Sequence, residues 1–149
     1  MKDLKTTIFG LAMTLAMVSS LAATETHASL YERLGGMPAI RAVVDDFVGR
    51  ILADERVNMW FAHAASDPER AALYKSKLAD FICQGTGGPC KYAGVDMQTA
   101  HKGRGVTAQA FDAVVEDLIA TLQKLNVPEK EKADLLSILG PMKSAVVQQ

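Results

Sequence analysis

The chain has 149 residues, of which 49% are hydrophobic and 22% are charged, and its formal net charge is −1. This length and composition are typical of one globular domain with a sizeable core. The balanced charge excludes the strongly basic surface that would indicate nucleic acid or an anionic membrane as a partner.

The N-terminal segment predicts a secretory signal peptide over residues 1–22. Two lysines precede an apolar run from Ile8 to Leu21, and small and polar residues follow it. This order is typical of an export signal, and we expect cleavage near Ala22, with Ala28 as a second option. The run is shorter than the roughly 20 residues of a spanning helix, so a membrane anchor is less favoured. We therefore expect a periplasmic or secreted protein that has no membrane segment in its mature form.

Residues 29–147 predict an all-helical domain. The sequence SLYE forms a capping box at Ser29, and Gly35-Gly36 ends the short helix that follows. Pro38 is expected to begin a second helix with apolar residues at helical spacing. These residues are Ile40, Val43, Val44, Phe47, Val48, Ile51 and Leu52. Residues 54–67 are interpreted as a connection that carries an aromatic cluster.

A third helix is expected from about Pro68 to Gly85, and one of its faces contains a lysine. Wound at 100° per residue, this helix places six side chains on the face expected to point inward. They are Leu73, Lys77, Phe81, Tyr74, Leu78 and Ile82. The cation at Lys77 therefore needs an explanation.

A glycine-rich loop from Gly85 to Gly94 follows, with Cys83 and Cys90 around its turn. In an oxidising compartment these cysteines are expected to form a small-loop disulfide, and the alternative is two free thiols. The chain has no CxxCH motif, which argues against covalent attachment of a c-type haem.

The C-terminal half predicts one short and two long helices. The short helix spans Met97 to His101, and Thr107 caps a long amphipathic helix after it. Pro128 is expected to begin the last helix. The inner face of that helix would carry Leu135, Leu136, Leu139, Met142 and Val146.

Few residues offer chemistry. No zinc cluster, phosphate loop or nucleophilic triad is present, and Glu116 and Asp117 fall on the polar side of their helix as expected surface residues. An apolar, aromatic interior with the imidazole of His101 and the amine of Lys77 would suit a haem. A plain helical core with one stray lysine is the simpler alternative.

Several segments together resemble the truncated haemoglobins, specifically their first group. They are SLYERLGGMPAI, VVDDFVGRILAD, TGGPCKYAG, MQTAHKGRGVTAQAFDAVVEDL and LNVPEKEKADLLSILGPM. The resemblance implies a two-over-two helical sandwich with a very short F helix around one haem b. It also implies that small diatomic ligands bind at the iron.

The resemblance assigns roles to individual residues. It implies that His101 is the proximal iron ligand and that Phe61 and Phe47 pack on the haem. Tyr92, Val106 and Phe111 are implied to line the proximal half or the haem edge. Arg104, or else Lys91 or Lys75, is implied to pair with a propionate.

The distal side departs from the oxygen-binding members of the family. Val48 stands where these members often carry a tyrosine, and Leu78 stands where they carry a glutamine. Tyr74, one turn earlier, is the only hydroxyl, which argues against fast nitric oxide dioxygenation. Lys77 stands where some members carry a sixth iron ligand, and the alternative is a lysine that extends along the haem edge to solvent or a propionate.

The expected function is that of a haem protein in reactive-nitrogen chemistry or electron transfer, with an unidentified reductase or electron donor. A peroxidase-like side activity would need His63 or Tyr74 near the distal face. A haem-free interaction or carrier domain of globin shape is the alternative from another class. A monomer or weak dimer is expected.

Overall fold

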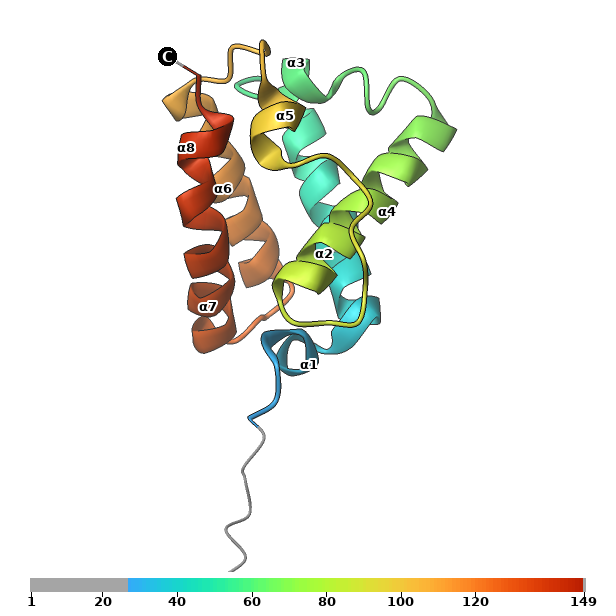
Figure 1. The fold of residues 1–149 in the computed structure, drawn as a ribbon, viewed down its shortest axis with the longest axis vertical. Helices are drawn as coiled ribbons and strands as arrows, with labels where there is room; N and C mark the ends of the chain where they lie inside the picture. Colours follow the sequence, from blue (N-terminus) through green and yellow to red (C-terminus); the bar gives the residue numbers. More distant parts are fainter. Residues whose placement is uncertain (1–26, 149) are drawn as a thin grey trace, which may run out of the picture.

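The computed structural model describes residues 27–148 (Figure 1). The predicted signal peptide and Ala22 lie outside these residues, whereas Ala28 is exposed in the segment before the first helix. The helices are α1 Leu30–Leu34, α2 Gly36–Ala53, α3 Asn58–Phe61, α4 Pro68–Gly85, α5 Met97–His101, α6 Ala108–Lys124, α7 Glu129–Leu139, the 3-10 helix η1 Gly140–Met142 and α8 Lys143–Val146. No strand occurs between residues 27 and 148, as an all-helical domain requires.

Two layers of helices make up the fold. In Figure 1, α2 and α4 cross in one layer, while α6 and the C-terminal helices form the other. Helix α2 joins the two layers, because it contacts α4 in its own layer and α6 in the other. Its side chains Ile40, Val44 and Ile51 are almost fully buried, as is Leu122 of α6. The apolar spacing of α2 and α6 therefore identified the core correctly.

Three predicted element boundaries are wrong. Helix α2 begins at Gly36 rather than at Pro38, because Gly35 adopts a left-handed φ of 100° and turns the chain at once from α1 into α2. The expected connection over residues 54–67 contains the one-turn helix α3. The predicted last helix changes to 3-10 geometry at Gly140–Met142, where Pro141 lacks the amide that a regular helix would use.

Ion pairs fix the outer helices to one another. Arg33 of α1 binds Glu131 and Asp134 of α7, each with an N–O distance of 2.6 Å. Asp46 of α2 accepts hydrogen bonds from Lys124 and from Arg50, and these cations hold the pKa of its carboxyl well below its usual range. Within the described residues, no helix combines the length and the apolar character needed to cross a membrane.

Candidate functional site

The face of α4 that we expected to point inward is divided between buried and exposed residues. Leu73 is 56% exposed and Lys77 is also exposed, whereas Tyr74 is only partly exposed. The fully buried residues of α4 are Ala79, Ile82 and Cys83. The prediction was right that Ile82 is buried, and it was wrong for Leu73 and Lys77, which are exposed. The edge that carries Leu73 and Lys77 points away from the protein core.

Two predicted distal residues and the predicted haem-packing phenylalanine meet around one small apolar cavity. Val48 of α2, Phe61 of α3 and Tyr74 of α4 all line it. The rings of Phe61 and Tyr74 are tilted against each other, with centroids 6.1 Å apart. Leu78, one turn after Tyr74, is half-buried, and Phe47 is almost completely buried in the core. The structure thus brings the expected distal side chains together from three helices.

Tyr74 is the polar group of this cluster. Burial, with a smaller contribution from the Tyr92 phenol, raises the pKa of its phenol to about 12, and the positive charge of Arg104 opposes both effects. Tyr74 therefore stays protonated at neutral pH and keeps an O–H donor.

His101 ends the short helix α5 and is half-buried. Asp96 caps the helix by accepting a hydrogen bond from the Thr99 amide, at 2.9 Å. The Nδ1 atom of His101 lies 2.7 Å from the carbonyl oxygen of Met97. A carbonyl can only accept a hydrogen bond, so Nδ1 carries the proton and the lone pair of Nε2 is left for a metal.

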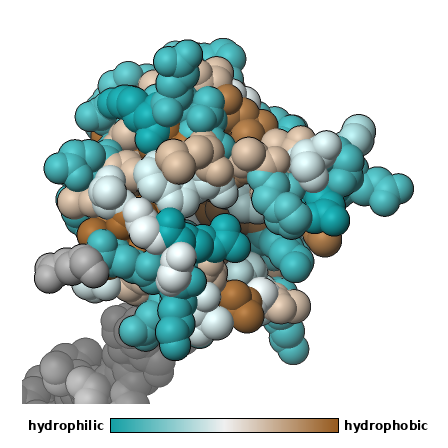
Figure 2. All heavy atoms as spheres, turned by 90° about the horizontal axis from the view of Figure 1, so that it is seen from above, coloured by the Kyte–Doolittle hydropathy of each residue, from teal (hydrophilic) through white to brown (hydrophobic). Residues whose placement is uncertain are grey.

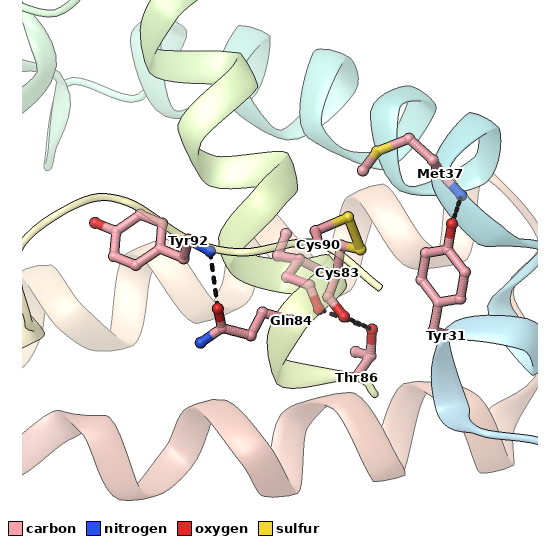
Figure 3. Close-up of a disulfide and its surroundings, with 8 residues drawn as sticks. Tyr31, Met37, Cys83, Gln84, Thr86, Cys90 and Tyr92 are labelled. Atoms are coloured by element: carbon pink, nitrogen blue, oxygen red, sulfur yellow. Dashed lines mark hydrogen bonds between the residues drawn. A yellow bond between two sulfur atoms is a disulfide. The ribbon is translucent and has the colours of Figure 1, made fainter. Parts of the chain in front are cut away.

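The loop between α4 and α5 is tied back to α4 (Figure 3). Cys83 and Cys90 form a disulfide, which confirms the predicted pairing over the alternative of free thiols. The Tyr92 amide donates to Oε1 of Gln84 at 2.8 Å, and the Tyr92 ring meets Phe81 edge-on with centroids 5.2 Å apart. These contacts fix the course of the loop that leads to His101.

The remaining predicted residues have clear positions. Val106 is buried, and Phe111 is half-buried beneath Nζ of Lys143, 5.6 Å from the ring centroid. Arg104 and Lys91 are exposed, whereas Lys75 forms an ion pair with Asp45 at 2.9 Å. Of the propionate candidates, Lys75 is thus already paired.

Sequence reasoning missed two features near the site. The indole Nε1–H of Trp60 donates to the Arg104 carbonyl at 2.9 Å, so α3 is joined to the loop after His101. Asp117, which we had expected on the surface, has a buried carboxyl oxygen without a hydrogen-bond partner, and burial raises its pKa. A lone tryptophan in a connecting segment was the only signal for the first feature, and the second had none.

No group of three or more histidine, cysteine or acidic side chains that could hold a metal gathers within residues 27–148. A metal site built on His101 therefore needs ligands from a prosthetic group. Three of the exposed large apolar side chains belong to elements around this site, namely Met59 on α3, Leu73 on α4 and Val95 before α5. Figure 2 shows hydrophobic side chains at the surface among hydrophilic ones.

Comparison with known proteins gives the same architecture. The family model described as bacterial-like globin matches residues 29–148. A group 1 truncated haemoglobin of Synechocystis sp. is 38% identical over 116 residues, covering 75% of this chain and 90% of the relative. Among solved structures, the truncated haemoglobin of Tetrahymena pyriformis in its Fe(III) form aligns with a TM-score of 0.73 and 31% identity, over 82% of this chain and 100% of that one. The 2/2 haemoglobin of Synechococcus sp. aligns with a TM-score of 0.73 and 37% identity, over the same shares.

The helical layers thus define a two-over-two globin fold. The chain belongs to the bacterial-like globin family, and within it to the group 1 truncated haemoglobins. Haem b is the cofactor of this class, and its globins bind small diatomic ligands. The proton on Nδ1 of His101 fits that cofactor, because it leaves Nε2 of the ring free to bind iron.

Proposed function

We propose that Nε2 of His101 holds the iron of haem b and that the α4 side of the pocket receives a diatomic ligand. The hydrogen bond from Nδ1 of His101 to the Met97 carbonyl carries this proposal, since it fixes the tautomer and orients the ring. When bound, the haem would supply an iron at which a diatomic ligand can bind. The family relationship and this bond disfavour the haem-free carrier domain.

The test removes the imidazole and then supplies it from solution. We expect His101→Gly to lose the Soret absorbance of the purified protein and to recover it when imidazole is added. His63→Ala is the matched control, because His63 is exposed and its Nε2 contacts Nη1 of Arg70 at 2.7 Å. Full haem retention in His101→Gly without imidazole would contradict the assignment.

We propose that Lys77 contacts the haem in one of two ways, either as a sixth ligand of the iron or beside a propionate. Its side chain is exposed, and it forms no ion pair within the described part of the chain. It belongs to the same edge of α4 as the exposed Leu73 and precedes the half-buried Leu78. Water can solvate an amine in this position, and haem bound beside this edge of α4 would offer it the iron or a propionate instead. A neutral amine can ligate iron, whereas a protonated one can only pair with a propionate.

Spectroscopy separates these two states. Ligation predicts a low-spin ferric spectrum that becomes high-spin in Lys77→Ala. Lys75→Ala is the matched control, since Lys75 lies two residues away and already pairs with Asp45. A high-spin spectrum in both the parent protein and Lys77→Ala would exclude ligation and leave the propionate contact.

We propose reactive-nitrogen chemistry or electron transfer as the reaction class, with a reductase or other electron donor as partner. The apolar side chains Val48 and Leu78 leave only Tyr74 as a distal donor, which favours these classes over fast dioxygenation. Tyr74 also serves a peroxidase-like side activity better than His63, which is exposed and bonded to Arg70. The choice between the two classes is tested by comparing the rate at which the protein consumes nitric oxide with the rate at which it exchanges electrons with a soluble donor.

We also propose that the protein is exported and acts outside the cytoplasm as a monomer or weak dimer. The disulfide supports this location, because such bonds persist in oxidising compartments. Mass spectrometry of the periplasmic fraction should find a new N-terminus after Ala22 or Ala28. Recovery of the intact N-terminus in the cytoplasm alone would contradict export.

A further inference from the structure

The loop between α5 and α6 is held by groups from distant parts of the chain. It follows His101 directly and contains Gly103 and Gly105 at left-handed φ values of 75° and 64°. These conformations interrupt the helical hydrogen-bond pattern. The course of the loop therefore depends on contacts from outside it.

Three successive residues of the loop receive such contacts. The Arg104 carbonyl accepts a hydrogen bond from Nε1 of Trp60, at 2.9 Å. The Gly105 amide donates to Oε1 of Gln148 at 3.2 Å, and the Val106 carbonyl accepts from the Gln148 amide at 3.0 Å. A side chain of α3 and the C-terminal segment thus hold neighbouring backbone groups from two directions.

We propose that Trp60 and Gln148 are positioning residues for His101, acting through this loop as a two-sided clasp. The inference rests on the proposed role of His101 as the iron ligand. Neither residue touches the reacting atoms. They would act by fixing the backbone that begins at the C-terminal end of α5, and thereby the direction of the imidazole.

The clasp also links the two sides of the site. Phe61, the residue after Trp60, lines the distal cavity with Tyr74. A shift of α3 that accompanies a change in the distal cavity would therefore pull on the Arg104 carbonyl. Conversely, a loop loosened on the His101 side would release α3.

The chain has one tryptophan, so the Trp60 indole gives a single, assigned nitrogen–proton signal in NMR spectra. In the haem-free protein we expect this proton to exchange with solvent about three- to tenfold more slowly than in an unfolded chain, the range for one net hydrogen bond. Exchange of this proton at the rate of an unfolded chain would overturn the proposed role of the hydrogen bond from Trp60 to the Arg104 carbonyl. This measurement does not depend on whether His101 binds iron.

In the haem-bound ferrous protein, Trp60→Phe keeps an aromatic ring but removes the donor. We expect the iron–histidine stretching band in the resonance Raman spectrum to shift or broaden and haem loss to a scavenger protein to rise about three- to tenfold. Asn58→Ala is the control, since Asn58 belongs to the same helix and its side chain forms no hydrogen bond within residues 27–148. An unchanged stretching band in Trp60→Phe would overturn the positioning role.

Gln148 provides an independent pair of variants if Trp60→Phe fails to fold. Gln148→Ala removes the acceptor of the Gly105 amide, whereas Gln148→Glu retains one. We expect faster Gly105 exchange and an altered stretching band in Gln148→Ala, and rescue of both in Gln148→Glu. Equal behaviour of Gln148→Ala and Gln148→Glu would overturn the proposed role of Gln148. Haem retention by His101→Gly without imidazole would instead refute the ligand assignment and leave the exchange data standing.

Discussion

Breaking the Cys83–Cys90 disulfide is expected to destabilise the protein by an amount that follows from its loop length. The two cysteines are separated by 7 positions in the sequence, so the bond closes a short loop. The chain-entropy relation for a loop of about 8 residues gives about 2.5 kcal/mol at 25 °C. For a domain of this size, that corresponds to a fall in melting temperature of about 10 °C.

Reduction of the unaltered chain is the cleanest perturbation, because Cys83 is fully buried and a substitution there would also change the packing. Urea unfolding of the haem-free protein, with and without excess dithiothreitol, measures the free energy of unfolding in both states. The Cys83→Ala/Cys90→Ala variant is the control and should give the same unfolding curve under both conditions.

A difference of less than about 0.5 kcal/mol between the oxidised and reduced chain would refute the reasoning. It would mean either that reduction adds little conformational freedom to the unfolded chain, or that native contacts hold the loop in place of the disulfide. One native contact is the Thr86 hydroxyl, which donates to the Ile82 carbonyl at 2.7 Å beside the disulfide (Figure 3). Reduction should also weaken haem binding, because this loop continues into the helix that ends at His101.

Three further predictions concern single side chains. Cationic partners lower the pKa of Asp46 from its ordinary value of 3.8. The ionised carboxylate therefore stabilises the fold above that pH, and this contribution is lost as the pH falls. The urea concentration at the unfolding midpoint, followed from about pH 5 to pH 2, should vary less for Asp46→Asn than for the parent chain. Gly94→Ala would place its Cβ atom against the ring and hydroxyl of Tyr92, where there is no room for it, and should cost about 1–3 kcal/mol in thermal unfolding. Tyr74→Phe removes the distal donor and should speed ligand dissociation from the ferrous protein about three- to tenfold in flow kinetics, whereas an unchanged rate would show that the phenol does not reach the ligand.

Features determined by local chemistry were predictable from the sequence. The Ser29 side chain and Glu32 form the expected capping box, and Thr107 accepts a hydrogen bond from the Ala110 amide at the start of α6. Such contacts involve residues three apart and need no knowledge of the fold. The disulfide was predictable for the same reason, because a flexible turn brings its ends together.

Contacts between distant segments could not be predicted in this way. The hydrogen bond from Trp60 to the Arg104 carbonyl spans 44 positions, and the bond from the Gly105 amide to Gln148 spans 43. Nothing in the local pattern of either segment identifies its partner. The environment of Asp117 on α6 is also non-local. Besides burial, its pKa is influenced by Asp54 and Arg56, which lie in the segment that follows α2.

Lys77 shows how an apolar pattern can be right about a face and wrong about what covers it. Amphipathic spacing identifies the side chains that avoid water, but it does not distinguish a protein core from the surface of a cofactor. On α4, Ala79 and Cys83 meet the core, whereas Leu73 is left 56% exposed on the edge that also carries Lys77. Water solvates the amine of Lys77 readily but leaves the apolar side chain of Leu73 uncovered. Haem would suit both residues, because its ring is apolar and its iron and propionates can each bind a nitrogen. The spin state of the Lys77→Ala variant decides which of these two contacts the lysine makes.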